Sequence, residues 1–322
     1  MLAPRVVVIH RRTELDELVD RHGTRGQAAF FLRSRGRDLT EVQSRHDANL
    51  AALRDASAAI PSEWRRGHVE RADLDRFLFE PEDIVLVVGQ DGLVANVAKY
   101  LSGQLVIGVD PEPERNPGVL VRHQATETLG LLASIGDGRA DIESRTMVVA
   151  SVDDGQTLLA LNEVYLGHPT HQSARYRLVE PAEERQSSSG LIVTSGTGAT
   201  GWCASIVRER SSRLRLPRPD DPALAWFVRE AWPSPATGVS HTEGLLELGS
   251  RLVVVVEADG LTAFGDGLEG DRLVVSWGQE VRIEIAEQRL HVVTGRQPSG
   301  DSPERATART RERVRAVGGG AR

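Results

Sequence analysis

Two continuous apolar runs in the first third of the chain enclose an amphipathic segment. Asp83–Val88 (DIVLVV) leads into the turn Gly89–Gly92 (GQDG), after which apolar residues from Leu93 to Leu101 recur at helical spacing. Leu105–Val109 (LVIGV) is the second run. Runs without polar alternation are typical of strands covered on both faces of a parallel sheet. The pattern therefore predicts a strand, a glycine turn, a helix and a second parallel strand.

The residues before this unit also predict a mixed α/β structure. Val6–Ile9 is a β-branched run that predicts a buried strand. From Thr13 to Ala59, apolar positions fall at helical spacing between many charges. Pro61 and the charged residues up to Asp75 end this helical pattern. We therefore expect residues 1–124 to form an α/β domain that carries the GQDG turn.

After about residue 125 the pattern changes to short β-rich runs, with one further helix expected near Leu129–Ile135. Such runs, separated by turn sequences, are typical of an antiparallel sandwich or prism. They are Thr146–Val152, Leu158–Leu166, Tyr176–Val179, Leu191–Thr194, Arg251–Glu257, Asp271–Ser276, Glu280–Ala286 and Gln288–Val293. We expect residues 125–295 to form a mostly-β sandwich domain. Residues 296–322, rich in Arg, Ser, Thr, Pro and Gly, are expected to be a disordered tail.

Composition narrows the class of protein. Hydrophobic residues make up 40% and charged residues 26% of the 322 residues, and the net charge is −7, so we expect a globular protein that does not bind nucleic acid. No apolar stretch approaches the roughly 20 residues of a membrane span, so a cytoplasmic protein without a membrane partner is expected. Cys203 is the single cysteine, which excludes an internal disulfide. Lys99 is the single lysine, so arginines, backbone amides and metal would have to bind most of any phosphate. Lys99 itself is expected to be solvated, with contact to an ATP phosphate as the alternative.

The stretch Ser195–Trp202 (SGTGATGW) contains glycines at the G-x-G-x-x-G spacing of a Rossmann dinucleotide site. The strand-like residues before it and the helix-like residues after it satisfy half of that pattern. A Rossmann unit also needs a second parallel strand and an acidic residue about 20 positions on. Ser211–Trp226 (SSRLRLPRPDDPALAW) instead has three prolines, which argue against a buried central strand and leave its aspartates in a loop with no second strand ahead. An ordinary glycine turn is the simplest alternative.

GQDG is the stronger candidate for chemistry. It stands at the carboxyl end of a predicted parallel strand, where open α/β sheets bind ligands, and at a helix N-terminus, whose free N–H groups suit phosphate oxygens. Gly89 and Gly92 would let the backbone approach a ligand closely. Asp91 could accept a proton from a hydroxyl or hold a metal ion on a nucleotide, and it could equally cap the helix. The spacing alone leaves these interpretations open.

Five stretches in consistent order, from about Pro81 to Val293, resemble motifs of the NAD kinase family. VLVVGQDGLVANVAKYL is similar to the family's glycine-glycine-aspartate-glycine turn, and LVIGVDPEPERNPG to the strand and loop that follow it in mitochondrial-type members. LLALNEVYLG carries the family's Asn-Glu pair as Asn162 and Glu163. SSGLIVTSGTGATGWCASI is similar to the Thr-Gly-Ser-Thr loop, and AFGDGLEGDRLVVSWGQEVRI to the late strand pair.

The resemblance implies an α/β domain and a dinucleotide-binding β-sandwich domain with the active site between them. It also implies a phosphotransferase that moves the γ-phosphoryl group of ATP, with Mg²⁺, to the 2′-hydroxyl of the adenosine ribose of NAD(H). Asp91 would be the catalytic base. The implied substrate-binding residues are Gly89, Gln90, Gly92, Asn162, Glu163, Thr197, Gly198, Thr200, Trp202 and Ser205. A homo-oligomer is implied as well.

Three positions depart from the family pattern. Gln90 stands at the second glycine of the turn, Leu93 where threonine is usual, and Ser189 where an aspartate is usual. Gln90 could clash with a phosphate or could supply an amide hydrogen bond. Two other functions therefore stand beside an NAD(H) kinase: an ATP-dependent kinase of another hydroxylated substrate, such as a sugar or nucleoside, and a non-catalytic NAD(P)-binding regulator. The retained aspartate and Asn-Glu pair argue against the regulator.

Overall fold

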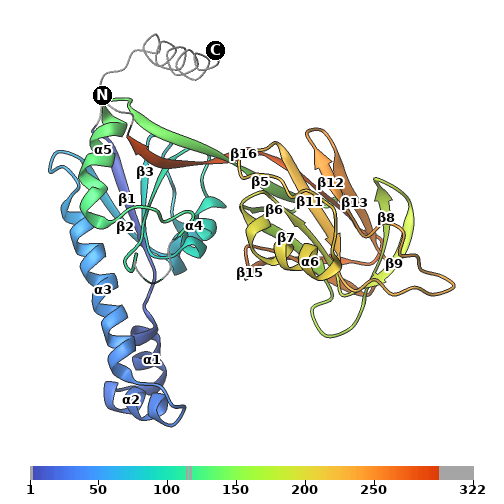
Figure 1. Cartoon of the computed structure of the whole chain (residues 1–322), viewed down its shortest axis with the longest axis horizontal. Coiled ribbons are helices and arrows are strands. Elements are labelled where there is room, and N and C mark those ends of the chain that lie inside the picture. The colour runs from blue at the N-terminus through green and yellow to red at the C-terminus, as the bar shows by residue number, and fades with distance from the viewer. Residues whose placement is uncertain (1–2, 114, 116–117, 297–322) are drawn as a thin grey trace, which may run out of the picture.

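The computed structural model describes residues 3–113, 115 and 118–296, which form two lobes joined by long strands (Figure 1). One lobe is built on a parallel sheet with helices, and the other on packed antiparallel strands. The predicted fold class, an α/β N-terminal part followed by a mostly-β sandwich, is confirmed. No helix within the described ranges is both long enough and apolar enough to cross a membrane.

The α/β lobe contains four parallel strands in the order β2-β1-β3-β4. They are β1 (Arg5–His10), β2 (Arg65–Glu70), β3 (Ile84–Val88) and β4 (Leu105–Val109). The uninterrupted apolar runs of β1 and β3 are buried on both faces, as predicted. β2 lies in the charged segment where the sequence indicated only a break. It is a mostly exposed edge strand, and it is held in the sheet by backbone pairing with β1 and not by a run of buried apolar side chains.

Helices cover both faces of this parallel sheet. α4 (Asp91–Ala98) packs on one face, while α3 (Leu39–Ala58) and α5 (Thr128–Gly136) pack on the other. The β1-to-β2 connection passes through α3 and the β3-to-β4 connection through α4, so the strand order reverses between β1 and β3. Such a reversal is where doubly wound sheets bind ligands, outside the carboxyl ends of the strands.

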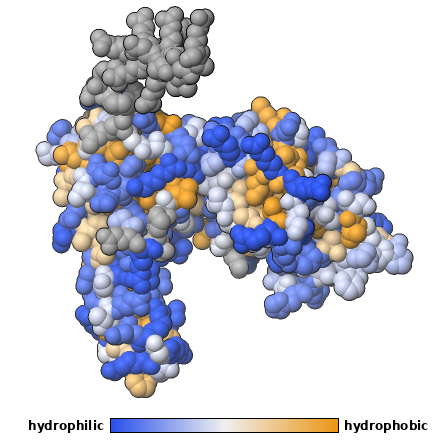
Figure 2. Space-filling model, in the orientation of Figure 1, coloured by the Kyte–Doolittle hydropathy of each residue, from blue (hydrophilic) through white to orange (hydrophobic). Residues whose placement is uncertain are grey.

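A helical projection extends from the α/β lobe and consists of α1 (Glu14–His22), α2 (Arg25–Arg33) and the first half of α3 (Figures 1 and 2). The sequence predicted a helical pattern across this region, and the breaks fall at capping residues. Thr13, Thr24 and Asp38 each accept a backbone N–H at the start of one helix. The projection has a small core of its own, separate from those beside the sheet, made of Leu15, Leu18, Ala28, Leu32 and Val42.

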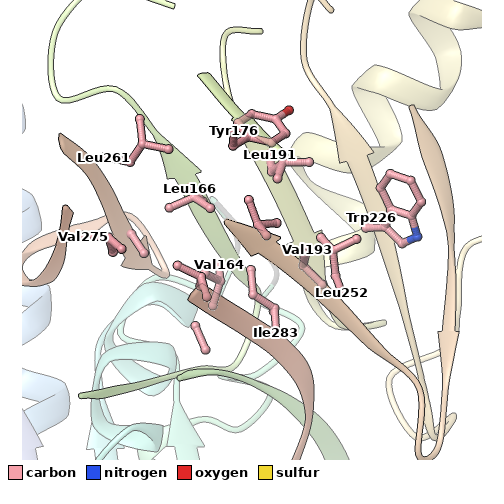
Figure 3. Packing of buried hydrophobic residues seen from close by; sticks show 14 of the residues in the cluster. Val164, Leu166, Tyr176, Leu191, Val193, Trp226, Leu252, Leu261, Val275 and Ile283 are labelled. Carbon is pink, nitrogen blue, oxygen red and sulfur yellow. The ribbon is translucent and has the colours of Figure 1, made fainter. Parts of the chain in front are cut away.

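The β-lobe is a sandwich of two antiparallel layers. One layer has the order β12-β11-β10-β7-β14-β15, and the facing layer contains β9-β8-β13 followed by parts of β16, β5 and β6. Leu191 and Val193 of the first layer face Leu252 of the second within a continuous apolar core (Figure 3). The strands that lie wholly in this lobe are β6 (Thr157–Ala160), β7 (Glu163–Gly167), β8 (Ala174–Glu180), β9 (Glu184–Ser188), β10 (Leu191–Thr194), β11 (Ala223–Val228), β12 (Glu243–Glu247), β13 (Arg251–Val256), β14 (Gly260–Gly265) and β15 (Leu268–Ser276).

Two long strands, β5 (Ala140–Val152) and β16 (Glu280–Arg296), connect the lobes. The first half of β16 pairs antiparallel with β13, and its second half runs parallel to β4, with His291 opposite Leu105. The sequence predicted two strands here, and the register does shift between Ile285 and Arg289.

The predicted domain boundary between residues 124 and 125 stays a prediction. Elements on its two sides pack against one another. α5 buries Leu131 and Leu132 in the core that contains Leu86 of β3, and the end of β16 extends the sheet of the α/β lobe. Of the predicted tail, Arg296 is the last residue of β16 and residues 297–322 lie outside the described residues.

Candidate functional site

The GQDG turn lies at the carboxyl edge of the parallel sheet, beside the point where the strand order reverses. Gln90 is the N-cap of α4 with an extended backbone, and Asp91 is the first helical residue. Gly92 is exposed, and a Cβ added there would meet nothing within 4 Å. All four turn residues line a cavity of about 510 Å³ between this edge and the helical projection. All four predicted GQDG residues therefore border the same cavity, although Gly89 itself is buried.

The Asp91 carboxylate is held by backbone N–H groups of the turn that follows β4. Its Oδ1 accepts from Leu120 N and Val121 N at 2.9 Å each, and its Oδ2 accepts from Val119 N at 2.8 Å. A carboxylate has about four acceptor positions, so these bonds leave one on Oδ2. Asp91 thus caps a neighbouring turn rather than its own helix. It could still accept one hydroxyl from a ligand in the cavity.

A second carboxylate, Asp110 at the end of β4, lines the same cavity and is 8% exposed. Its Oδ1 accepts from Glu112 N at 2.8 Å. Burial, together with the negative charges of Glu112 and Asp91, raises the pKa of Asp110. Two carboxylates beside a cavity fit Mg²⁺, which prefers oxygen ligands and is usually held by one or two carboxylates plus substrate phosphates. Within the described ranges there is no cluster of three or more potential metal-ligating His, Cys, Asp or Glu side chains.

The Asn-Glu pair lies in the β-lobe, where the predicted strand Leu158–Leu166 is broken into β6 and β7. The break is stabilised by Asp266, whose carboxylate accepts from Leu161 N at 2.9 Å and Asn162 N at 2.6 Å. Burial raises the pKa of Asp266 to about 6, and burial together with the Asp266 charge raises the pKa of Glu163 to about 7. Both members of the pair are half-buried, and neither side chain hydrogen-bonds to another described residue.

The glycines of SGTGATG serve close backbone packing. A Cβ on Gly196 would lie 1.9 Å from Arg218 O, and one on Gly198 would lie 2.5 Å from Asn162 O. The loop joins β10 to α6 (Trp202–Arg210) through a short 3₁₀ turn, Gly198–Thr200. The chain then returns as β11, which pairs antiparallel with β10. The prediction that this segment is not a Rossmann βαβ unit is therefore confirmed.

The expectation that no strand follows this loop is wrong. Pro222 immediately precedes β11 instead of interrupting it, and the apolar residues Leu224–Val228 are buried between β10 and β12. The three prolines shape the connection, and the strand begins only after the last of them.

Arg145 of β5, which sequence reasoning missed, lies between the two groups of predicted site residues. Its side chain is fully buried, and its Nη1 donates to Thr197 Oγ1 at 3.3 Å. Nη2 lies 2.9 Å from Glu143 Oε1, although its geometry is not that of a hydrogen bond, and Nε has no hydrogen-bond partner. Burial lowers the pKa of this guanidinium, while the charges of Glu143 and Asp91 act in the opposite direction. The signal available in the sequence was an arginine directly before the predicted strand Thr146–Val152.

The remaining predicted residues are spread over the SGTGATG loop and α6. Thr200 is exposed, and its hydroxyl donates to Thr197 O at 3.3 Å. The Trp202 ring stacks on Tyr165 with centroids 5.8 Å apart, and the Arg229 guanidinium lies 4.9 Å from the Trp202 ring centre. Ser205 is exposed on α6. Trp202 therefore already has partners within the protein.

The prediction that Lys99 is solvated is wrong. Its side chain is 4% exposed, and Nζ lies 2.9 Å from both Gly265 O and Asp271 Oδ2. The end of α4 packs against the β14–β15 turn, which removes this ammonium group from water. Lys99 therefore ties the α/β lobe to the β-lobe instead of facing the cavity.

These features define a class of two-lobed protein: a parallel sheet with a glycine-aspartate turn at its carboxyl edge, joined by shared strands to a sandwich that carries an Asn-Glu pair and a threonine-rich loop. The resemblance to the NAD kinase superfamily is confirmed by sequence similarity to known NAD kinases. No family model matches the chain.

Three curated relatives are similar to this chain. It is 28% identical to NAD kinase 2, mitochondrial, of Rattus norvegicus over 187 residues, covering 44% of each chain. It is 26% identical to the NAD kinase of Psychrobacter arcticus over 189 residues, covering 54% of this chain and 57% of the relative. It is 27% identical to the NAD kinase of Halorhodospira halophila over 155 residues, covering 45% and 49%. The chain thus spans about half the length of the curated relatives that it matches.

Proposed function

We propose that the protein is an NAD(H) kinase that transfers the γ-phosphoryl group of ATP to the 2′-hydroxyl of the adenosine ribose, giving NADP(H). The observation that carries this proposal is the Asp91 carboxylate. Three backbone N–H groups fix it at the cavity wall and leave one acceptor position for a hydroxyl. The similarity to three NAD kinases supports the choice of substrates.

Asp91 would orient the ribose hydroxyl and accept its proton as the oxygen attacks the γ-phosphorus. The new O–P bond forms while the bond to the bridging oxygen of ADP breaks, and the proton later passes to solvent. Phosphoryl transfer depends mainly on alignment and charge neutralisation. A base in this role contributes about 10²–10⁴-fold to the rate.

The β-lobe would hold the dinucleotide. The Asn162 amide and the Glu163 side chain make no hydrogen bond to another described residue, and they would bind hydroxyl or amide groups of NAD(H). Arg145 donates to the Thr197 oxygen, so the Thr197 hydroxyl hydrogen is free to be donated to a ligand. Gly198 would hold the loop against Asn162. Thr200, Trp202 and Ser205 would form the outer part of this site.

Mg²⁺ would enter with ATP and would be held by Asp110, whose Oδ2 makes no hydrogen bond to a described residue. When bound, the ion would neutralise phosphate charge. A homo-oligomer and a cytoplasmic location remain predictions of the resemblance and of the sequence, respectively.

The test is formation of NADP(H) from Mg-ATP and NAD or NADH, detected with an NADP-specific dehydrogenase. Asp91→Asn keeps one acceptor oxygen and so can retain two of the three turn hydrogen bonds. We expect it to lower turnover by about 10²–10⁴-fold with NAD binding nearly unchanged. The unfolding midpoint should fall slightly, because the Val119 N–H loses its acceptor. Undiminished turnover in Asp91→Asn would contradict the role of Asp91.

Two other outcomes would identify the alternative functions. ATP turnover only with another hydroxylated acceptor would indicate a kinase of that acceptor. Tight NAD(P) binding without turnover, under any phosphoryl donor, would indicate a regulator.

A further inference from the structure

Two charged side chains lie on β5 where this strand passes from one lobe to the other (Figure 1). Glu143 and Arg145 are two positions apart in the strand, so their side chains point to the same side. Glu143 lies opposite Val292 of β16 and Arg145 lies opposite Leu290, within a stretch of continuous register. The backbone therefore holds these two side chains at a fixed spacing.

Glu143 connects two arginines that belong to different parts of the molecule. Its Oε2 lies 3.0 Å from Nη2 of Arg122, in the turn after β4, and its Oε1 lies 2.9 Å from Nη2 of Arg145. The Arg122 side chain is 34% exposed, whereas that of Arg145 is fully buried. Burial lowers the pKa of the Arg145 guanidinium, and the charge of Glu143 is the largest influence in the opposite direction. Glu143 is therefore the counter-charge of a buried cation.

The two ends of this cluster reach groups that the proposed reaction uses. Arg122 Nε donates to Val119 O at 2.6 Å, and Val119 N donates to Asp91 Oδ2 at 2.8 Å. At the other end, Arg145 Nη1 donates to Thr197 Oγ1 at 3.3 Å. A continuous series of contacts thus runs from the Asp91 carboxylate to the SGTGATG loop.

The distance between these two ends matters for phosphoryl transfer. The ribose hydroxyl would be held by the β-lobe, whereas the carboxylate that accepts its proton is Asp91 of the α/β lobe. Reacting groups must lie about 3–3.5 Å apart, and a displacement of about 1 Å can lower the rate by about 10²-fold. Contacts that fix the Asp91 turn relative to the Thr197 loop should therefore affect the chemical step more than the binding of either substrate.

We propose that Arg122, Glu143 and Arg145 are positioning residues that hold the Asp91 turn in place relative to the Thr197 loop, across the boundary between the lobes. This inference rests on the proposed function and adds residues that act through others. Glu143 is the centre of the cluster, because one of its carboxylate oxygens faces each arginine. Loss of either contact releases one loop from the other.

Steady-state kinetics of Arg122→Ala tests the proposal with little risk to folding, because Glu143 stays paired with Arg145 and no buried charge loses its partner. We expect kcat to fall by about tenfold to a hundredfold, while KM for NAD and KM for ATP stay nearly unchanged. Arg122→Lys keeps the charge that faces Glu143 but lacks the planar fork that also reaches Val119 O. It should therefore recover part of the loss.

Arg139→Ala is the matched control, because this exposed arginine just before β5 pairs with Asp137 and its loss should leave kcat unchanged. Glu143→Gln tests whether the contacts act in series, and its kcat should fall at least as far as that of Arg122→Ala. The variant with both substitutions should be no slower than Glu143→Gln, because both break the same series of contacts. Fold-changes that multiply in the double variant would overturn the proposal, as would equal kcat values for Arg122→Ala and Arg139→Ala.

Hydrogen exchange separates failure of this proposal from failure of the proposed function. The three backbone N–H groups that bond to Asp91 report the order of its turn without requiring turnover. We expect them to exchange faster in Arg122→Ala than in Arg139→Ala. Absence of NADP(H) formation by the wild-type protein would refute the proposed function, and the exchange rates would still test the contacts. Equal exchange in the two variants would overturn the positioning role whether or not NADP(H) forms.

Discussion

Replacing Glu163 by Gln should raise the free energy of unfolding above pH 7 and leave it nearly unchanged near pH 4. In the folded protein, burial and the neighbouring Asp266 raise the pKa of Glu163 from 4.5 to about 7. The unfolded chain loses this proton near the ordinary pKa, so between the two values the folded state binds more protons. Stability therefore falls as the pH rises through this window. A pKa difference of this size corresponds to roughly 3 kcal/mol, which is the upper limit of the gain expected for Glu163→Gln at pH 8.

Urea unfolding at several pH values from 4 to 8.5 measures this effect. Wild-type protein should lose stability between about pH 4.5 and 7, and Glu163→Gln should lose much less. A smaller decline should remain in the variant, because the pKa of Asp266 is raised to about 6. Glu247→Gln is the control, since Glu247 is an exposed carboxylate in the same lobe. Equal pH dependence in wild type and Glu163→Gln would refute the reasoning.

The same titration should appear in ligand binding. Glu163 is divided between its neutral and ionised forms near pH 7, and only the ionised form accepts hydrogen bonds through both oxygens. If NAD hydroxyls donate to this carboxylate, NAD affinity should rise from pH 6 to pH 8 and binding should release protons. Calorimetry in buffers of different ionisation enthalpy detects the released protons, and Glu163→Gln should abolish the release that depends on this residue.

Two further substitutions test contacts that the fold creates. Lys99→Met should lower the free energy of unfolding, measured in urea, by about 1–3 kcal/mol. The loss should be smaller than for a fully buried ion pair, because water reaches Asp271. An unchanged unfolding midpoint would contradict a stabilising contact between the lobes. Gly196→Ala should cost about 1–3 kcal/mol, because its Cβ would lie 1.9 Å from Arg218 O and the loop must move. Gly92→Ala, where a Cβ meets nothing within 4 Å, is the matched control for stability and should have a much smaller effect.

The sequence by itself determined the elements whose signals are local. The β3–GQDG–α4–β4 unit follows from two uninterrupted apolar runs, a glycine turn and one amphipathic helix. These patterns depend on residues close together in the chain. The sequence also excluded a Rossmann unit, but the prolines were the wrong reason, because a strand does follow them and the unit is excluded by the antiparallel pairing of β11 with β10. The motif order was sufficient to indicate the superfamily, and it placed Asp91 and the Asn-Glu pair in candidate sites.

Only the tertiary structure decided which groups meet. Lys99 pairs with Asp271, 172 positions away, and no local pattern identifies such a partner. The polar β2 and the proline-flanked β11 form strands because neighbouring strands pair with them. Arg145 lies beside Thr197 because β5 passes between the lobes. Pairing, burial and charge neutralisation depend on long-range contacts, and for that reason the sequence alone could not show which of these groups meet.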